Sequence, residues 1–228
     1  MARDSDDRQG GRTRLPAHEQ IYRRLRAMVL FGDLAPGEAV TIQGLSARLE
    51  AGMTPVREAI RRLIAAGALE SLGNRRVCVP HPSAADIGDI SIARQWLEAH
   101  LAHRATTRAG AGDLARLARL DGDLDGAIAD GDLRGYLECN YRFHRAVYDL
   151  AEAPVLTALA DGLWLRFGPS LRVVCGRLGT QNLPDQHKAM LQAMARGDAE
   201  AAAAAMREDV AQGMEQMRLA LGNRRRAR

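Results

Sequence analysis

The feature that most constrains the fold is a very short connection between two amphipathic helices near the start of the chain. The segment IQGLSARLEA after Thr41 has its leucines at helical spacing, and Gly52 ends this run. Thr54 is the expected N-cap of the next helix, TPVREAIRRL, and Pro55 would take its first position, where a missing N–H costs nothing. Only about three residues then join the two helices, which is the spacing of a helix-turn-helix.

The segments on either side complete a small domain. Upstream, apolar residues recur at helical spacing from Ile21 on, until FGDLAPGEAV interrupts the pattern with Gly and Pro. Downstream, two strand-like runs, ALESL and RRVCV, flank Gly73 and Asn74, which is typical of a tight hairpin. Three helices and a hairpin over residues 15–80 predict a winged helix-turn-helix, preceded by a disordered tail over residues 1–14.

After residue 80 the hairpin patterns stop and helical periodicity takes over. We expect helical segments at residues 84–107, 113–129, 132–150, 154–174, 184–196 and 198–221. Their short connections predict an all-helical bundle over residues 81–222, with a basic tail at residues 223–228. The fold class expected for the whole chain is therefore mainly α, with one small β-hairpin in its first domain.

The charges are divided unevenly along the chain. Residues 1–80 carry a net charge of +4, residues 81–223 carry −4, and the basic C-terminal end is positive again. A basic first domain on an acidic body indicates that the first domain meets a polyanion. No apolar run approaches the roughly 20 residues of a membrane span, and the polar N-terminus lacks the core of a secretory signal. We therefore expect a cytoplasmic protein with no membrane partner, and reduced thiols at Cys78, Cys139 and Cys175.

The second helix of the expected helix-turn-helix has the chemistry of a DNA-reading element. Its N-terminus offers free backbone N–H groups to a phosphate, which the side chain of Thr54 could also reach. Arg57, one turn along, is placed to read a guanine edge in the major groove, and Arg61 would meet backbone or base one turn further. An arginine-rich face can also be merely solvated, but the hairpin adds cations, and the lack of an aromatic platform favours duplex DNA over RNA. Flanking contacts are expected from Gln43, Asn74, Arg75 and Arg76.

These residues resemble the N-terminal domain of GntR-type transcription regulators. The resemblance is strongest in DLAPGE and TPVREAIRRL, and the rest of the chain is similar to the helical ligand-binding domain of the FadR subfamily. It implies that Arg57 reads DNA and that Thr54 contacts the DNA backbone. The chain departs from the family at Met53, where the family usually has arginine, and at Gln43, where it often does. Losing two cationic contacts is expected to flatten the salt dependence of DNA binding, by roughly one unit of slope for each.

A second pattern predicts a metal site in the helical half. In ECNYRFHRAVYDLA, Asn140 and His144 are four residues apart and so lie on one face of a helix. His187 and Asp209 lie on opposite sides of Gly197 in an expected helical hairpin, at nearly the same level. Two imidazoles, one carboxylate and one amide oxygen suit a transition metal. The alternative is that these are ordinary hydrogen-bonded polar residues of a bundle.

The resemblance to the FadR subfamily bears on this choice. Many of its ligand domains bind a metal through an Asp-x3-His pair and two later histidines. His144 and His187 match that pattern, whereas Asn140 replaces the aspartate and Asp209 replaces the last histidine. The formal charge of the ligand set is unchanged because the carboxylate has moved from one side to the other. We expect a divalent metal, zinc or nickel, held by Asn140, His144, His187 and Asp209.

A small organic acid is the expected effector of such a pocket. Arg94 matches an arginine that recurs at the start of this domain in the family, and it could pair a carboxylate through two hydrogen bonds. Arg166 is a further candidate, as is Arg172, and the alternative for each is a structural ion pair. His100 and His103 are three residues apart but have no evident partner, so we interpret them as packing or surface residues.

Together these observations predict a homodimeric transcription regulator, a repressor rather than an activator, that binds operator DNA and responds to a small carboxylate. Two other classes of function are open. A metal centre in a bundle could catalyse hydrolysis, but no glutamate base, Ser–His pair or Gly-rich phosphate loop accompanies it, so we expect no enzyme. A chromosome-organising protein that binds DNA without an effector is the other alternative.

Overall fold

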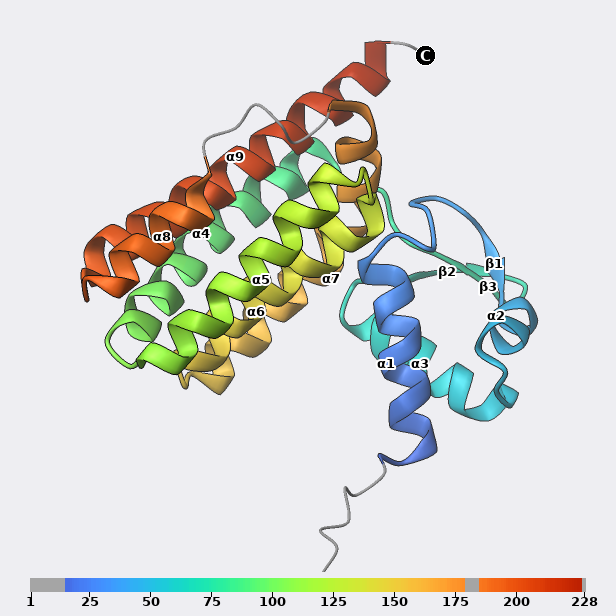
Figure 1. The fold of residues 1–228 in the computed structure, drawn as a ribbon. Helices are drawn as coiled ribbons and strands as arrows, with labels where there is room; N and C mark the ends of the chain where they lie inside the picture. The colour runs from blue at the N-terminus through green and yellow to red at the C-terminus, as the bar shows by residue number, and fades with distance from the viewer. Residues whose placement is uncertain (1–14, 179–184, 227–228) are drawn as a thin grey trace, which may run out of the picture.

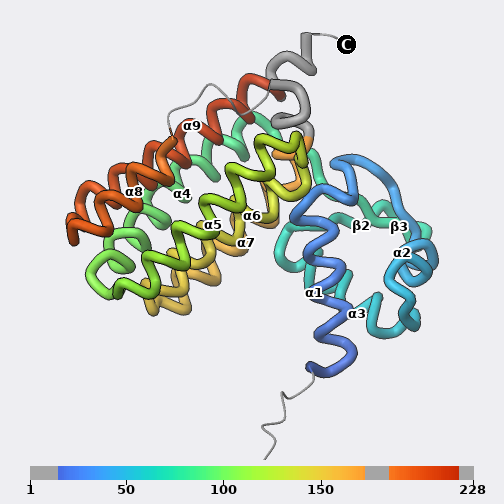
Figure 2. The backbone as a smooth tube through the Cα atoms, in the orientation of Figure 1, coloured from blue at the N-terminus to red at the C-terminus, as the bar shows by residue number. Residues whose placement is uncertain are grey.

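The structure is a computed structural model that describes residues 15–178 and 185–226. The expected tail over residues 1–14 and the last two residues, 227–228, lie outside these ranges, as does the segment 179–184. We call residues 15–80 the head and residues 84–226 the bundle. Figures 1 and 2 show the head to one side of the bundle.

The head contains three helices and a small sheet, as expected for a winged helix-turn-helix. In chain order its elements are α1 (Ala17–Leu30), β1 (Val40–Thr41), α2 (Ile42–Leu49), α3 (Met53–Ala65), β2 (Glu70–Gly73) and β3 (Arg76–Cys78). The antiparallel sheet has the order β1-β3-β2. The two-residue strand β1, which pairs with β3, was not predicted, because it is too short to give a periodic signal.

The turn between α2 and α3 is built from local backbone preferences. The Thr41 hydroxyl accepts the Gly44 N–H at 2.9 Å, which confirms Thr41 as the N-cap of α2. Glu50 then takes a left-handed conformation (φ 50°) and ends the helix. The predicted N-cap at Thr54 is wrong: α3 begins at Met53, with Gly52 as its extended N-cap residue. Pro55 still lies in the first turn, where N–H groups have no partner within the helix.

The hairpin turn differs from the prediction by one residue. Asn74 (φ 48°) and Arg75 (φ 58°) both have positive φ and form a two-residue loop between Gly73 and Arg76, which are paired in the ladder. The expected turn residues were Gly73 and Asn74. An irregularity in the ladder accounts for the shift: Ser71 pairs with Val77 and Gly73 with Arg76, so Leu72 is an extra residue on β2 and the turn moves to Asn74 and Arg75.

The bundle is all helical, as predicted from its periodicity. Its elements are α4 (Ala84–Thr106), α5 (Ala111–Ala129), α6 (Leu133–Leu150), α7 (Pro154–Leu178), α8 (Gln186–Ala195) and α9 (Ala199–Arg226). Helix α7 continues through Gly176, where a stop was expected, and α9 continues into the basic segment expected as a tail. Helices α4 and α9 lie side by side (Figure 1). No helix within the described residues is long and apolar enough to cross a membrane.

Head and bundle share one contiguous apolar core. It runs from Leu25 and Val29 on α1 to Trp164 and Phe167 on α7. Among the helices of the head, α1 packs against α7. Gly168 permits this approach, because a Cβ atom at that position would lie 3.0 Å from the carbonyl oxygen of Leu30. Within the described residues the apolar core is therefore continuous from the head into the bundle.

Candidate metal centre and DNA-binding surface

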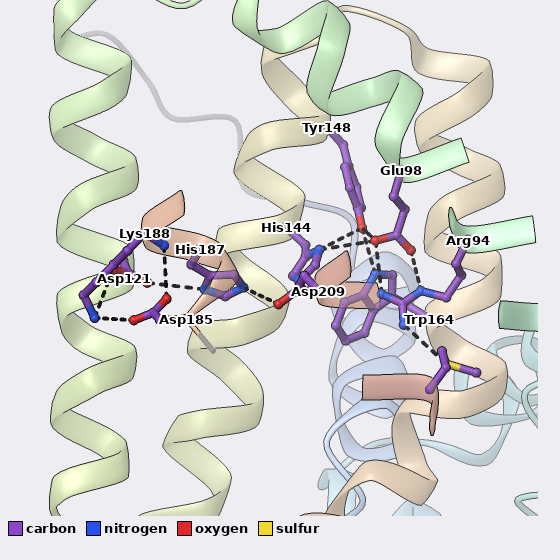
Figure 3. Close-up of polar contacts among 11 residues, drawn as sticks. Arg94, Glu98, Asp121, His144, Tyr148, Trp164, Asp185, His187, Lys188 and Asp209 are labelled. Carbon is purple, nitrogen blue, oxygen red and sulfur yellow. Dashed lines mark hydrogen bonds and ion pairs between the residues drawn. The ribbon is translucent and has the colours of Figure 1, made fainter. Parts of the chain in front are cut away.

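Three of the four predicted metal ligands meet inside the bundle. His144 projects from α6, His187 from α8 and Asp209 from α9 (Figure 3). The two oxygens of Asp209 face one imidazole each: Oδ2 lies 3.1 Å from His144 Nε2, and Oδ1 lies 3.6 Å from His187 Nε2. Ligand atoms from all three residues lie within 4.8 Å of one another, which is close enough for a single ion to reach all of them.

Each imidazole has a carboxylate at its other nitrogen. His144 Nδ1 lies 3.2 Å from Glu98 Oε2, and His187 Nδ1 lies 3.3 Å from Asp121 Oδ1. Such outer carboxylates fix the ring orientation and tautomer of metal-binding histidines, and leave Nε2 to face the ion. The Phe143 ring, stacked on His187 with centroids 4.0 Å apart, also restrains that imidazole.

Helix contacts explain why neither outer carboxylate was predicted. Glu98 comes from α4 and Asp121 from α5, and each meets a histidine on another helix. Glu98 could have been suspected, because it lies four residues after Arg94 on one helix face. Nothing in the local sequence around Asp121 points to α8.

The charges of the cluster are strongly coupled. Burial alone would raise the pKa of Asp209, but the nearby His187 and His144 outweigh it and lower that pKa to about 2. Burial would likewise raise the pKa of Glu98, but Arg94 and then His144 lower it to about 2. The same two carboxylates overcome the effect of burial on His144 and raise its pKa. The two carboxylates therefore favour the protonated form of His144, and a metal bound at this nitrogen would have to displace that proton.

The residues present fit a divalent metal. His187 Nε2 is buried and has no hydrogen-bond partner within the described residues, although it lies near Asp209. An orphaned imidazole nitrogen of this kind needs an explanation, and a bound ion supplies one. Two nitrogens, each with a carboxylate behind its ring, and the carboxylate of Asp209 form a set that zinc accepts and that leaves a coordination position open.

Asn140, the fourth predicted ligand, lies one turn before His144 on α6 and is half-buried. Its side chain makes no hydrogen bond to another described residue. Asn140 therefore lies on the same helix as His144, but its amide is not hydrogen-bonded to His144, His187 or Asp209.

Arg94, the expected effector ligand, lies inside the bundle and is already paired. Its guanidinium is buried and pairs with Glu98 through both oxygens, one at 3.0 Å. It also lies over the rings of Phe167 (4.1 Å) and Trp164 (4.7 Å). The physical reason is that a buried guanidinium needs a partner at all times. Arg94 instead holds Glu98, which in turn orients His144.

Arg166 and Arg172 are also placed differently from the prediction. Arg166 donates to the carbonyl oxygen of Ala66 at 3.4 Å, and Arg172 donates to Gly32 and to Asp33. Both arginines thus bridge α7 to the head, so they are outside the bundle interior where an effector was expected to bind.

The predicted DNA-contacting side chains of the head are exposed, apart from the half-buried Met53. Arg57 and the two wing arginines form no ion pair with another described residue, and Arg61 approaches only Glu58, at 3.8 Å. The start of α2 lies against the wing, because the Ile42 N–H donates to the Arg75 carbonyl at 3.1 Å. This contact places Gln43 beside the wing turn. The exposed set is Gln43, Thr54, Arg57, Arg61, Asn74, Arg75 and Arg76.

Arg62, by contrast, is held within the head. Its guanidinium donates to Glu19 at 2.9 Å and lies 3.4 Å from the centre of the Tyr22 ring. Both partners are on α1. This contact fastens α3 to α1, so the two helices should move as a unit.

A continuous series of contacts leads from the cluster to the head. Glu98 contacts both His144 and the Tyr148 hydroxyl, and the Trp164 indole N–H donates to that hydroxyl at 3.0 Å. Two more contacts continue the series from Trp164 to the head. The Tyr141 ring meets Trp164 edge-on (5.3 Å between centroids), and Arg26 on α1 donates to the Tyr141 hydroxyl at 2.9 Å.

Comparisons with known proteins agree with both halves of this description. Residues 17–79 match the model of the gntR family of bacterial regulatory proteins, and residues 89–212 match the FCD domain. The chain is 30% identical over 152 residues to the HTH-type transcriptional regulator McbR of Escherichia coli K12, covering 67% of this chain and 69% of McbR. It is 28% identical to the HTH-type transcriptional repressor RspR of the same organism, over 60% of each protein.

Solved structures show the same architecture. The structure of E. coli McbR/YncC superposes with a TM-score of 0.84 at 26% identity, covering 90% of this chain and 98% of that one. A GntR regulator from Rhodococcus sp. RHA1, described as a putative transcriptional regulator, gives a TM-score of 0.72 at 24% identity, which supports the fold alone.

Proposed function

The chain belongs to the gntR family of bacterial transcription regulators and carries an FCD domain, and on this basis we propose that it is a homodimeric repressor. In this proposal, a small carboxylate bound to a metal in the bundle controls the affinity of the protein for operator DNA. The family establishes a DNA-binding transcription regulator and not an enzyme. The metal, the effector, the dimer and the sign of regulation are parts of our proposal, as is a cytoplasmic location.

One observation carries the proposal: the convergence of His144, His187 and Asp209 inside the bundle, with a contact series that ends on α1 of the head. In the proposed complex these three side chains hold the ion, with Asn140 as a further donor. The ion, zinc or nickel, would supply a positive centre to which an effector carboxylate attaches. Glu98 and Asp121 keep the two imidazoles turned toward it.

The head would read DNA with α3. Arg57 is proposed to read a base edge in the major groove, Thr54 and Met53 to lie at the phosphate backbone, and Arg61 to meet backbone or base. The wing residues Asn74, Arg75 and Arg76, together with Gln43, would contact the flanking backbone or minor groove. The two cationic positions lost at Met53 and Gln43 would thus be offset from the wing.

The first experiment measures the affinity of the protein for its own promoter fragment and for random DNA. Zinc-loaded protein, chelator-treated protein and zinc-loaded protein with small hydroxy acids or sugar acids are compared. An acid that changes the affinity for the promoter fragment supports the proposal. Equal affinity for both DNAs would indicate a chromosome-organising protein, and consumption of the acid would indicate an enzyme.

The metal is tested separately by counting ions per chain with plasma mass spectrometry after dialysis, and by titration with zinc and nickel. The proposal fails if no ion is present and none binds. His187→Ala should lower the metal content and leave promoter binding intact. If that variant stays folded but loses promoter binding, the proposed division of labour between bundle and head is wrong.

Coupling between the two halves has its own test. Tyr141→Phe removes the hydroxyl that joins Arg26 to Asp161 while keeping the ring against Trp164. Allosteric coupling is typically 1–3 kcal/mol, and changes in a coupling network alter it by about 0.5–2 kcal/mol. We expect zinc to bind this variant normally, but the effector acid found in the first experiment to change its promoter affinity less than in the unaltered protein. An unchanged effect of the acid would mean that the coupling uses other contacts, such as those of Arg166 and Arg172.

A further inference from the structure

The outer face of α4 and α9 exposes a large aromatic side chain. Trp96, near the middle of α4, is 77% exposed, and Ile92, one turn earlier on the same side, is 58% exposed. Tryptophan is enriched among the residues that contribute most to protein–protein binding. Neither side chain contributes to the buried cluster or to the contact series toward the head. This face therefore needs a separate explanation.

Beside Trp96 the surface is hollowed between the two helices. The hollow has a volume of about 500 Å³, and its lining includes Trp96, Ala99 and His103 from α4 and Glu200, Ala203 and Arg207 from α9. The two alanines have small side chains and are buried at its floor. A projecting indole and an open hollow thus lie next to each other on one face.

The two helices run antiparallel, which sets the order of residues around the hollow. His103 Nε2 lies 3.4 Å from Glu200, and Arg94 contacts Met214 further along both helices. Seven residues back from His103 is Trp96, and seven residues on from Glu200 is Arg207. Trp96 and Arg207 therefore form one end of the hollow, and His103 and Glu200 form the other.

The two ends of the hollow have opposite charges available. Arg207 is exposed and forms no ion pair with another described residue. The side chain of Glu200 is 89% exposed, and its contact within the described chain is with His103. A twofold axis that lies in the plane between the two copies, over the middle of the hollow and perpendicular to α4 and α9, would exchange its ends. Each Arg207 would then face Glu200 of the other copy, and each Trp96 would enter the other hollow next to His103.

We infer that this face of α4 and α9 binds a second copy of the same chain, in a twofold-symmetric contact built on Trp96 and on reciprocal Arg207–Glu200 pairs. The inference rests on the homodimer in the proposed function and assigns its surface. Shape and charge both favour a second copy over an unrelated partner, because the projection and the hollow that receives it, and the cation and the anion that pairs with it, are all on one protomer.

Charge reversal gives a direct test by light scattering of the full-length protein. Arg207→Glu and Glu200→Arg each place like charges across both contacts, so each variant alone should dimerise at least about a hundredfold more weakly. In an equimolar mixture, a chain carrying Arg207→Glu can pair with a chain carrying Glu200→Arg, and opposite charges then face each other at both contacts. The mixture should therefore regain the molar mass of a dimer.

A heterologous or unrelated contact would not be rescued in this way. Arg196→Glu, at the end of α8, is the matched control, because Arg196 is exposed and does not line the hollow. Trp96→Ala should also shift the protein to monomer, whereas Val155→Ala, a similarly exposed apolar position on α7, should not. Circular dichroism checks that each variant is folded.

The outcomes separate this inference from the proposed function. If the unaltered protein is a dimer and the α4–α9 variants remain dimers, the face is wrong and the homodimer stands. The same conclusion follows if the variants are monomers whose mixture stays monomeric. A monomeric unaltered protein at all concentrations would overturn both the face and the homodimer. The DNA and metal tests are not affected by any of these results.

Discussion

The head and the bundle place their charged groups in opposite ways. In the head, Arg57 and the wing arginines point to solvent and form no ion pair with a described residue. In the bundle, Arg94, Glu98 and His144 are buried, and each has partners on neighbouring helices. Free surface cations are ready to meet a polyanion without rearrangement. A buried and paired cluster instead binds only a ligand that can replace one of its internal contacts.

The same difference should govern what each ion pair contributes to stability. Arg94 and Glu98 are almost fully buried, so removal of one charge leaves the other in a poorly solvating interior. Arg62 and Glu19 keep partial exposure in the head, and water can replace either partner. The predictions below compare the two regions, starting from the largest expected effect.

Glu98→Ala should lower the free energy of unfolding by about 3–5 kcal/mol, because it leaves the Arg94 guanidinium buried without its carboxylate. Urea denaturation in the presence of a chelator measures this loss without a contribution from metal. Glu19→Ala is the matched change in the head, and we expect it to cost less than about 1 kcal/mol. If Glu98→Ala and Glu19→Ala lower the free energy of unfolding equally, the ion pairs of the bundle and of the head do not differ in their contribution to stability.

Arg57→Ala should weaken binding to the promoter fragment by about 1–3 kcal/mol while changing binding to random DNA little. The reason is that a base contact carries specificity, whereas a phosphate contact is common to all sequences. Fluorescence anisotropy with both DNAs measures the difference. Arg116→Ala, an exposed arginine of the bundle, serves as the control and should have no effect. Equal losses on both DNAs would show that Arg57 touches only phosphate.

Asp121→Asn should lower zinc affinity about 10- to 100-fold, the usual cost of removing an outer carboxylate from a ligating histidine. Competition with a chromophoric chelator gives the affinity. Asp125→Asn is closely matched, because Asp125 also contacts Lys188 but not His187. If the two variants bind zinc equally well, Asp121 does not support His187 as a ligand.

Met53→Arg should produce the smallest change, and it acts only on the head. Restoring a cation at the start of α3 adds one phosphate contact, so the slope of log affinity against log salt should steepen by about 0.9. The measurement is a salt titration of binding to random DNA. An unchanged slope would mean that residue 53 does not reach the backbone in the complex, and zinc binding should be the same in both proteins.

The sequence was most informative where structure and function are local. The caps, turns and arginine spacing of residues 41–76 predicted a winged helix-turn-helix. The errors in these caps and turns were a two-residue shift of the α3 N-cap, from Thr54 to Gly52, and a one-residue shift of the hairpin turn, to Asn74 and Arg75. Helical periodicity likewise predicted the bundle. Both signals arise within one or two turns of chain, which is the range over which capping and amphipathic spacing act.

The cluster in the bundle was only partly predictable. The pairing of His187 with Asp209 follows from the hairpin of α8 and α9, and His144 joins them in the structure. Glu98 and Asp121 come from helices whose neighbours cannot be read from periodicity. Arg94 shows the same limit, because its partner decides whether it is a free cation or a buried structural one.

Helix α1 belongs to both halves of the protein, since its Leu30 end packs on Gly168 and its Glu19 end fastens Arg62 of α3. An engineer who transplants the head onto another helical domain must therefore carry over the Leu30–Gly168 fit as well. A chimaera joined at residue 80 without this fit would leave apolar surface of α1 exposed to water and would aggregate.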